Sequence, residues 1–417
     1  MNSKEKTAKP GGMLHTFARL HRTVKASGWV SLVTDFSSDM IYPLLPLFLK
    51  SVLGTGAAFI GLVEGAAETT ASLLKLWSGY LSDRLGQRKS LVLLGYGISS
   101  FARPLMALTT TGWHVLALRL TDRVGKGIRT SPRDALIAAC TRPEERGIAF
   151  GFQRSMDHAG AFIGPLVAAG LLWWFQDSLH WEQGVSLRWV FALAAIPGLL
   201  APLIIWRYIE DAPPTDSRAP VQAPLTAEGA RGLGHEYWKY LAAVLVFTLG
   251  NSSDAFLVLR AVDVGVPQWQ VPILWAAFHA VKTLCSTPGG RLSDLRGRKP
   301  PLFLGWLIYM VSYVLFGLAS APWQIWGIFL FYALFHSCTE GTERAFVADL
   351  VPADRRGTAY GWFHAVVGVA ALPASLLFGV VWQLTKSPLP PFLMGAGLAG
   401  VGAVLLVFVR PARVPRP

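Results

Sequence analysis

The residues of this sequence that could do chemistry are charged side chains inside long apolar stretches. The first apolar stretch contains Asp35 and Asp39, and the second contains Glu64 and Glu68. The members of each pair are four residues apart, so they share one face of a helix. A charge at the centre of a membrane helix costs about 2.5–3.5 kcal/mol on insertion scales, so each of these residues must face a partner or a wet cavity.

Two roles fit these carboxylates. Removal from water favours the protonated form of a carboxyl group, so one or more of the four can take up and release a proton. The alternative for each single residue is structural pairing with an arginine or lysine of a neighbouring helix. Because four carboxylates on two helices exceed what packing alone needs, we predict that the group handles protons or cations.

The counter-charges lie in the fourth apolar stretch. Seven charged residues recur there at three- and four-residue steps and therefore form one helix face: Arg119, Asp122, Arg123, Lys126, Arg129, Arg133 and Asp134. We expect some of the basic residues, with Arg119 and Arg123 as the site candidates, to pair with the carboxylates of the first two helices. If they do not, the basic face would favour an anionic substrate, and the sequence leaves both possibilities open.

Four further residues join the predicted proton and substrate site. Asp157 lies in the fifth apolar stretch, Asp254 in the seventh, His279 in the eighth and His336 in the tenth. Asp254 holds the position in the second half of the chain that Asp39 holds in the first. No two histidines show the four-residue spacing of a metal-binding helix, so we assign no metal site.

Composition places the chain in a membrane. Of its 417 residues, 52% are hydrophobic and 15% are charged, whereas soluble domains are about 25% charged. This balance excludes an ordinary cytosolic enzyme. A helix needs about 20 apolar residues to cross a bilayer, and we predict twelve such spans: 28–50, 57–81, 89–110, 113–139, 147–174, 187–208, 238–262, 268–290, 300–320, 323–348, 357–384 and 389–410.

The net charge of +13 reflects orientation in the membrane and not nucleic-acid binding, because the arginines and lysines gather in alternate loops. This pattern predicts that both termini, the tails 1–27 and 411–417, are cytoplasmic. The amino-terminal tail has no cleavage site after a short apolar core, so we expect no removed signal peptide.

The chain is internally duplicated. Residues 209–237 have no apolar periodicity and form a predicted cytoplasmic linker between two six-helix bundles, 28–208 and 238–410. Ser37-Ser38-Asp39 returns as Ser252-Ser253-Asp254, and the stretch 146–152 returns as 356–362, at offsets of 215 and 210 residues. Parallel halves of this kind place a substrate site between them near the membrane midplane.

A third repeat is a short basic loop with fixed glycine and aspartate positions. The first copy follows the second span and the other follows the eighth, 211 residues later. A glycine-permitted turn in which aspartate faces arginine can latch neighbouring helices. The residues predicted for this gating loop are Gly79, Asp83, Arg84, Gly86, Arg88 and Lys89, with Gly290, Asp294 and Arg298 in the second copy.

With this loop and its repeat, the chain resembles the major facilitator superfamily. The resemblance implies an all-α membrane protein, with twelve transmembrane helices in two pseudo-symmetric six-helix bundles, that transports solutes by alternating access. In the fifth span the spacing of Gly160 and Gly164 permits close helix contact, and Pro165 kinks the helix. These residues are similar to the antiporter motif of the superfamily, which implies export.

Three further stretches, 34–43, 63–68 and 122–134, look like a bacterial branch that includes nickel-resistance exporters. That resemblance adds a divalent metal cation to the expected substrates. The chain lacks the histidine-rich tail typical of those exporters and ends in Arg413-Val414-Pro415-Arg416-Pro417.

We therefore predict a proton-coupled exporter of a small solute, either a drug-like compound or a divalent metal cation. Its expected partners are the solute, protons and the lipid bilayer of the inner membrane, with no nucleic acid and no cofactor, and we expect a monomer. An importer of a small organic anion is one alternative, and a non-transporting membrane sensor or scaffold is another. No nucleophile elbow, metalloprotease helix or phosphate loop occurs, so we expect no enzyme.

Overall fold

A computed structural model of the chain describes residues 20–85, 88–142, 145–211, 230, 232–352 and 355–410. All regular elements in these ranges are helices or short 3₁₀ and π turns. The first half contains α2 (Arg22–Ile41), η1 (Tyr42–Leu44), α3 (Leu45–Leu47), η2 (Phe48–Val52), α4 (Ala57–Leu85), α5 (Arg88–Leu105), η3 (Met106–Leu108), α6 (Gly112–Ala139), α7 (Arg146–Trp173), η5 (Trp174–Ser178), α8 (Gln183–Leu193) and α9 (Ala195–Tyr208). The second half contains α11 (His235–Gly250), α12 (Ala255–Asp263), α13 (Gln270–Arg296), α14 (Lys299–Leu318), α15 (Pro322–Leu350), α16 (Arg356–Thr385) and α17 (Leu389–Val407).

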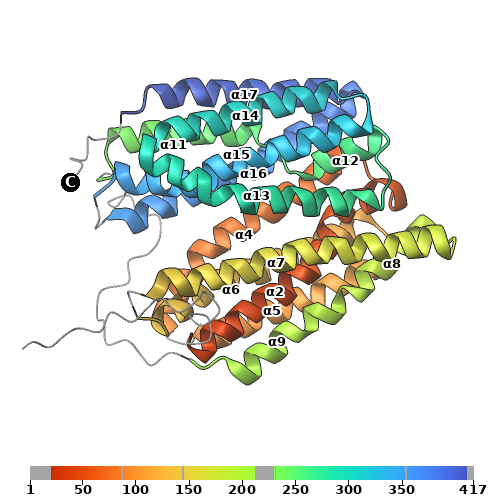
Figure 1. The fold of residues 1–417 in the computed structure, drawn as a ribbon, viewed down its shortest axis with the longest axis horizontal. Coiled ribbons are helices and arrows are strands. Elements are labelled where there is room, and N and C mark those ends of the chain that lie inside the picture. The colour runs from red at the N-terminus through yellow and green to blue at the C-terminus, as the bar shows by residue number, and fades with distance from the viewer. Residues whose placement is uncertain are drawn as a thin grey trace, which may run out of the picture.

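Each of the twelve predicted spans holds one long helix or one consecutive group of helices, so the predicted all-helical architecture is confirmed. The elements from α2 to α9 lie on one side of the molecule and those from α11 to α17 on the other (Figure 1). The two sides meet where α4 packs along α16 and α7 along α13. The linker boundaries stay a prediction, because residues 212–229 and 231 lie outside the described ranges.

Several of the predicted spans are broken helices, among them the sixth, which is divided into α8 and α9, and the first and the seventh. Pro43 and Pro46 follow α2, where the chain passes through a 3₁₀ turn, since proline removes a backbone donor. The seventh span, predicted as one helix, is interrupted between Gly250 and Ala255, so Asp254 lies in the break and not inside a helix. In that break the Ser253 hydroxyl accepts a hydrogen bond of 3.2 Å from the Ala255 N–H. Serine side chains compete in this way with helical backbone bonds.

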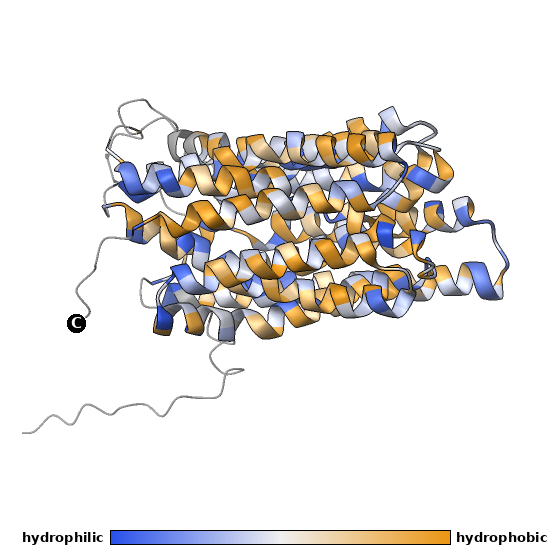
Figure 2. Cartoon of the chain, turned by 90° about the horizontal axis from the view of Figure 1, so that it is seen from above, coloured by the Kyte–Doolittle hydropathy of each residue, from blue (hydrophilic) through white to orange (hydrophobic). Residues whose placement is uncertain are grey.

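The outer surface of the helices is apolar. Large hydrophobic side chains such as Trp206, Leu284 and Leu384 are 68%, 75% and 77% exposed. Such exposure is favourable in lipid and unfavourable in water. Hydrophobic residues predominate along the helices, and hydrophilic ones gather mainly at the two ends of the molecule (Figure 2). In the described residues, eight helical segments are long and apolar enough to cross a membrane. The other four segments contain α2, α6, α13 and α15, which carry many of the charges described below.

Glycines allow the closest helix contacts. A Cβ atom on Gly160 would lie 2.3 Å from the Leu32 carbonyl oxygen, and one on Gly164 would lie 2.4 Å from that of Phe36. The close contact predicted from this glycine spacing is thus present between α7 and α2. Gly61 makes the corresponding contact between the two halves, because its Cβ would lie 2.2 Å from the Ser375 carbonyl oxygen of α16.

Candidate functional site

A cavity of about 590 Å³ lies between the two halves of the molecule. Helices α2, α4, α5, α6 and α7 line it from the first half, and α13 and α15 line it from the second. Its walls carry eight arginines and lysines, six aspartates and glutamates, and three histidines: Arg103, Arg119, Arg123, Lys126, Arg129, Arg154, Lys282, Arg344; Asp35, Asp39, Glu68, Asp122, Asp157, Glu340; His158, His279, His336. A wall this charged is typical of a wet, solute-accessible site.

Most of the residues predicted from the sequence meet in this cavity. Eight of the ten predicted proton and substrate residues line it: Asp35, Asp39, Glu68, Arg119, Arg123, Asp157, His279 and His336. Glu64 and Asp254 do not belong to the lining. The Asp254 carboxylate instead accepts a hydrogen bond of 2.8 Å from the Tyr332 hydroxyl inside the second half.

Glu64 forms a buried two-pronged ion pair. The Arg119 guanidinium donates from Nε and Nη2 to the two carboxylate oxygens at 3.2 and 3.0 Å. Both side chains are 6% exposed. Such bidentate, charge-assisted contacts are the strong class of hydrogen bond. The pairing of a fourth-span arginine with a second-span carboxylate, one of the two possibilities left open by the sequence, is therefore present for this pair.

Asp122 lies at the centre of a second group of arginines. Arg103 donates from Nε to Asp122 at 3.0 Å and from Nη1 to the Thr34 carbonyl oxygen at 2.9 Å. Arg119 and Arg123 also approach the Asp122 carboxylate, at 3.8 and 4.0 Å. One buried carboxylate thus lies among several cations of α5 and α6.

The remaining carboxylates of the first half are held by other groups. Asp35 lies within hydrogen-bonding reach of Asp157. Asp157 also pairs with Arg154 at 3.2 Å. Asp39 accepts a hydrogen bond of 3.3 Å from the Trp275 indole N–H of α13, so it links the two halves.

Glu68 lines the cavity with no hydrogen bond or ion pair to any described residue. The three cavity carboxylates Asp35, Asp39 and Glu68 therefore make no ion pair within 4.0 Å in the described part of the chain, in contrast to Glu64.

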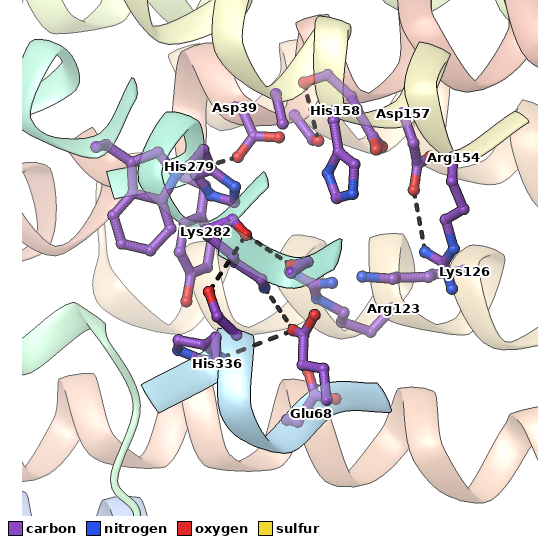
Figure 3. A pocket seen from close by; sticks show the side chains of 18 of the residues that line it. Asp39, Glu68, Arg123, Lys126, Arg154, Asp157, His158, His279, Lys282 and His336 are labelled. Atoms are coloured by element: carbon purple, nitrogen blue, oxygen red, sulfur yellow. Dashed lines mark hydrogen bonds and ion pairs between the residues drawn. The ribbon is translucent and has the colours of Figure 1, made fainter. Parts of the chain in front are cut away.

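The opposite wall, formed by α13 and α15, holds two predicted histidines together with charged residues that were not among the predicted candidates. Lys282 of α13 pairs with Glu340 of α15 at 2.5 Å, and His336 Nδ1 lies 3.7 Å from the same carboxylate. Both ring nitrogens of His279 are buried and have no hydrogen-bond partner among the described residues. Lys282, Glu340 and Arg344 were identifiable from the sequence, since each is a charge inside a predicted span. Figure 3 shows how His279, Lys282 and His336 lie across the cavity from Arg123 and Lys126.

The gating loop is described only in part. Gly86 and the side chains of Asp83, Arg84 and Asp294 lie outside the described parts of the structure. Gly79 lies in α4, and the Cβ of Ser131 in α6 would be 3.5 Å from a Cβ added to it. The latch function of the gating loop stays a prediction.

Four further residues of the gating loop have described positions. Arg88 begins α5. The Lys89 N–H donates to Asp211 at 2.9 Å, and Arg298 Nε donates to Asp349 at 3.3 Å. Gly290 lines the cavity at the end of α13 near the second copy of the loop.

The molecule is closed on the side opposite the gating loops. There Lys50 Nζ pairs with Asp263 across the two halves at 2.5 Å. The Ala58 N–H donates to the Gln383 side-chain oxygen at 3.2 Å, also across the halves. The cavity lining extends the other way, from Trp275 toward Gly290 and Arg344 on the gating-loop side.

Metal and disulfide chemistry find no support in the described residues. No three histidine, cysteine, aspartate or glutamate side chains there converge as metal ligands. Cys140, Cys285 and Cys338 are all free thiols.

Comparison with known proteins identifies the family. The family model of the major facilitator superfamily matches residues 28–279 and 240–417. The uncharacterised MFS-type transporter MJ1317 of Methanocaldococcus jannaschii is 33% identical over 396 residues, which cover 94% of this chain and 95% of that protein. The multidrug resistance protein MdtH of Cronobacter sakazakii is 24% identical over 380 residues, 88% of this chain and 89% of that protein.

Solved structures share the fold at low sequence identity. The nucleoside transporter NupG aligns with a TM-score of 0.76 at 14% identity, over 92% of this chain and 99% of that one. A bacterial homologue of the human lysosomal transporter Spinster, in an inward-facing and unoccupied conformation, aligns with a TM-score of 0.73 at 16% identity, over 96% of both chains.

These findings confirm the predicted family, fold and absence of enzymatic activity, whereas the resemblance to nickel-resistance exporters stays a prediction. A twelve-span helical fold, an apolar belt and a charged cavity between two halves agree with the family match. The chain belongs to the major facilitator superfamily and is a multi-pass membrane transporter of small molecules.

Proposed function

We propose that this transporter is a proton-coupled exporter, in which solute leaves the cell as protons enter. The cavity would carry the solute, and Asp35, Asp39 and Glu68 would carry the protons. Both termini and the gating loops would face the cytoplasm, because the loops on that side hold the arginines and lysines. The inner membrane of the cell is the proposed location.

The observation that supports this proposal is the set of carboxyl groups in the cavity. Asp35, Asp39 and Glu68 have no ion pair within 4.0 Å among the described residues, whereas Glu64 is held by Arg119. Asp35 lies close to Asp157, and two neighbouring carboxyl groups disfavour each other's charged form. Carboxyl groups that exchange protons in the solute cavity couple proton movement to solute movement, because the proton and the solute compete for one site.

Export is favoured by two further points. The relative MdtH is a multidrug resistance protein, and it is similar over most of the length of both chains. The contact of Gly160 and Gly164 with α2 forms the close packing of the antiporter-like motif. A cavity open on the gating-loop side would take solute from the cytoplasm, after which closure there and separation of Lys50 from Asp263 would release it on the far side.

The proposal is tested in two stages. Growth of deletion and overexpressing strains is first compared across metals, antibiotics and organic acids, and a solute whose toxicity falls on overexpression is taken forward. Purified protein is then placed in liposomes with a pH-sensitive dye, and the solute-driven proton flux is recorded. We expect Asp35→Asn and Glu68→Gln to lower this flux about a hundredfold or more, the lower end of the range that general acid–base groups contribute to proton transfer.

Asp177→Asn is the matched control, because Asp177 is an exposed carboxylate on the far side of the membrane from the gating loops and does not line the cavity. Its flux should equal that of the wild type. Wild-type flux in both Asp35→Asn and Glu68→Gln would contradict the assignment of protons to these carboxylates.

Import of a small organic anion is the second candidate. It is favoured by the excess of basic over acidic side chains in the cavity wall, eight against six. The direction of proton movement separates the two candidates, because an anion bound together with protons moves in the same direction as the protons, whereas an exchanged solute moves in the opposite direction. The liposome experiment reports this direction directly.

A further inference from the structure

We propose that Arg123 and Lys126 form a subsite that binds the anionic group, a carboxylate or a phosphate, of the transported solute. This inference rests on the proposed function in one respect: the cavity must be the place where the solute binds. It adds the chemical class of the solute, which neither the family nor the relatives supply. It holds for an exported zwitterion as well as for an imported anion.

Of the six other cations of the cavity wall, five are already engaged, and the sixth, Arg344, belongs to α15 on the opposite wall. Arg119 is held by Glu64, and Arg103 is held by Asp122 and the Thr34 carbonyl oxygen. Arg129 donates to the Ser99 hydroxyl at 2.7 Å and lies 4.2 Å over the Tyr96 ring. Arg154 pairs with Asp157, and Lys282 pairs with Glu340. These side chains have their partners in the protein and do not need a ligand.

Arg123 is different. Its side chain lines the cavity and is only 11% exposed, yet its Nε–H has no hydrogen-bond partner among the described residues. The nearest carboxylate oxygen belongs to Asp122 at 4.0 Å, and that carboxylate is already the acceptor for Arg103. A buried donor without a partner is costly, so a bound acceptor at this place would be stabilising.

Lys126 lies three residues further along α6, on the same helix face. Its side chain lines the cavity and makes no hydrogen bond or ion pair with any described residue. Arg123 and Lys126 are close enough to repel each other strongly, while Glu68 and Asp35 attract Lys126 only from beyond contact distance. An anion between the two side chains would replace this repulsion by two charge-assisted hydrogen bonds.

The remainder of the solute would reach the opposite wall. Figure 3 shows His279 across the cavity from Arg123 and Lys126. Both His279 ring nitrogens are buried without partners in the described part of the protein, so they are available to a polar group of the solute. A solute that touches both halves at once couples its own binding to their relative movement, as alternating access requires.

The test is equilibrium binding to purified protein in detergent, without a proton gradient. Isothermal titration is run with inorganic phosphate, with succinate and with the neutral diamide of succinate, at constant ionic strength. We expect phosphate or succinate to bind and the diamide to fail. Arg123→Gln and Lys126→Gln should each lower the affinity for the anion about tenfold or more, which is the effect of one lost charge-assisted contact.

Lys282→Gln is the matched control, because it removes one positive charge from the same cavity but from a side chain already held by Glu340. Its anion affinity should fall by a much smaller factor. Lys126→Arg keeps the charge and should keep binding, which separates a lost contact from misfolding, and thermal melting of each variant reports its folding.

Three results would overturn the inference: no binding of either anion, equal binding of the diamide, or equal weakening by Lys282→Gln. Each is distinguishable from failure of the proposed function. Proton flux driven by a solute without an anionic group would contradict the anion subsite and support proton coupling. Anion binding with no proton flux in liposomes would support the subsite and contradict proton coupling.

Discussion

At the scale of single residues, two glutamates of one helix have different surroundings. Glu64 and Glu68 share a stripe of α4, yet Glu64 is enclosed by Arg119 while Glu68 lines the cavity without an ion pair to any described residue. Removing one partner from a buried ion pair leaves the other charge uncompensated, whereas an unpaired carboxylate has no such contact to lose. Replacement of the glutamate by glutamine should therefore lower stability at position 64 and transport at position 68.

We predict that Glu64→Gln lowers the free energy of unfolding by about 3 kcal/mol, the lower end of the range for a broken buried ion pair, since Asp122 still lies 3.8 Å from Arg119. Glu68→Gln should leave stability unchanged and reduce proton-coupled flux instead. Unfolding of both variants in a denaturant titration, alongside the liposome assay, separates the two effects. Equal stability of both variants would show that the Glu64 pair contributes nothing.

At the scale of elements, the contact of α7 with α2 depends on glycine. A methyl group at Gly164 would meet the Phe36 carbonyl oxygen at 2.4 Å, and backbone atoms cannot move aside as a flexible side chain can. Gly170 lies in the same helix and has nothing within 4 Å of the place where a methyl group would be. The helix thus provides its own control.

We expect Gly164→Ala to cost about 1–3 kcal/mol of stability, as overpacking of a tight contact does, and Gly170→Ala to cost nothing. Thermal melting of the two purified variants checks this. If the two variants melt at the same temperature, the α2–α7 contact is not limited by close approach of the backbones.

At the scale of the whole molecule, the closed side must open during transport. Lys50 and Asp263 join the two halves there, and the cavity lies toward the gating loops. Alternating access requires this contact to break in every cycle, whereas solute binding from the gating-loop side does not require it to break.

We predict that covalently joining positions 50 and 263 stops transport but preserves binding. Lys50→Cys and Asp263→Cys are introduced together into a chain whose Cys140, Cys285 and Cys338 are replaced by serine, and a short reducible thiol cross-linker is added. Transport should fall to the background and return on reduction, and each single cysteine variant serves as a control. Undiminished transport by the cross-linked protein would mean that these positions never separate.

The sequence by itself determined the architecture and the family. Apolar stretches of membrane-spanning length, repeated motifs and the basic loop predict twelve helices in two related halves, because the bilayer forces every backbone polar group into a helix. The same reasoning placed Asp35, Asp39, Glu68 and His279 inside the membrane, where a charge or a polar ring needs a reason to be. These four residues do meet in one cavity.

Only the tertiary structure decided which of these groups face one another. Helix periodicity fixes the face on which a residue lies but not the neighbour toward which that face turns, since this depends on how each helix is rotated against the next. Thus Glu64 and Glu68 share a stripe but not a partner, Asp254 turns to Tyr332 inside its own half, and Lys282 meets Glu340 from another helix. The closed side and the direction of the cavity are likewise properties of packing between halves, which no local pattern encodes.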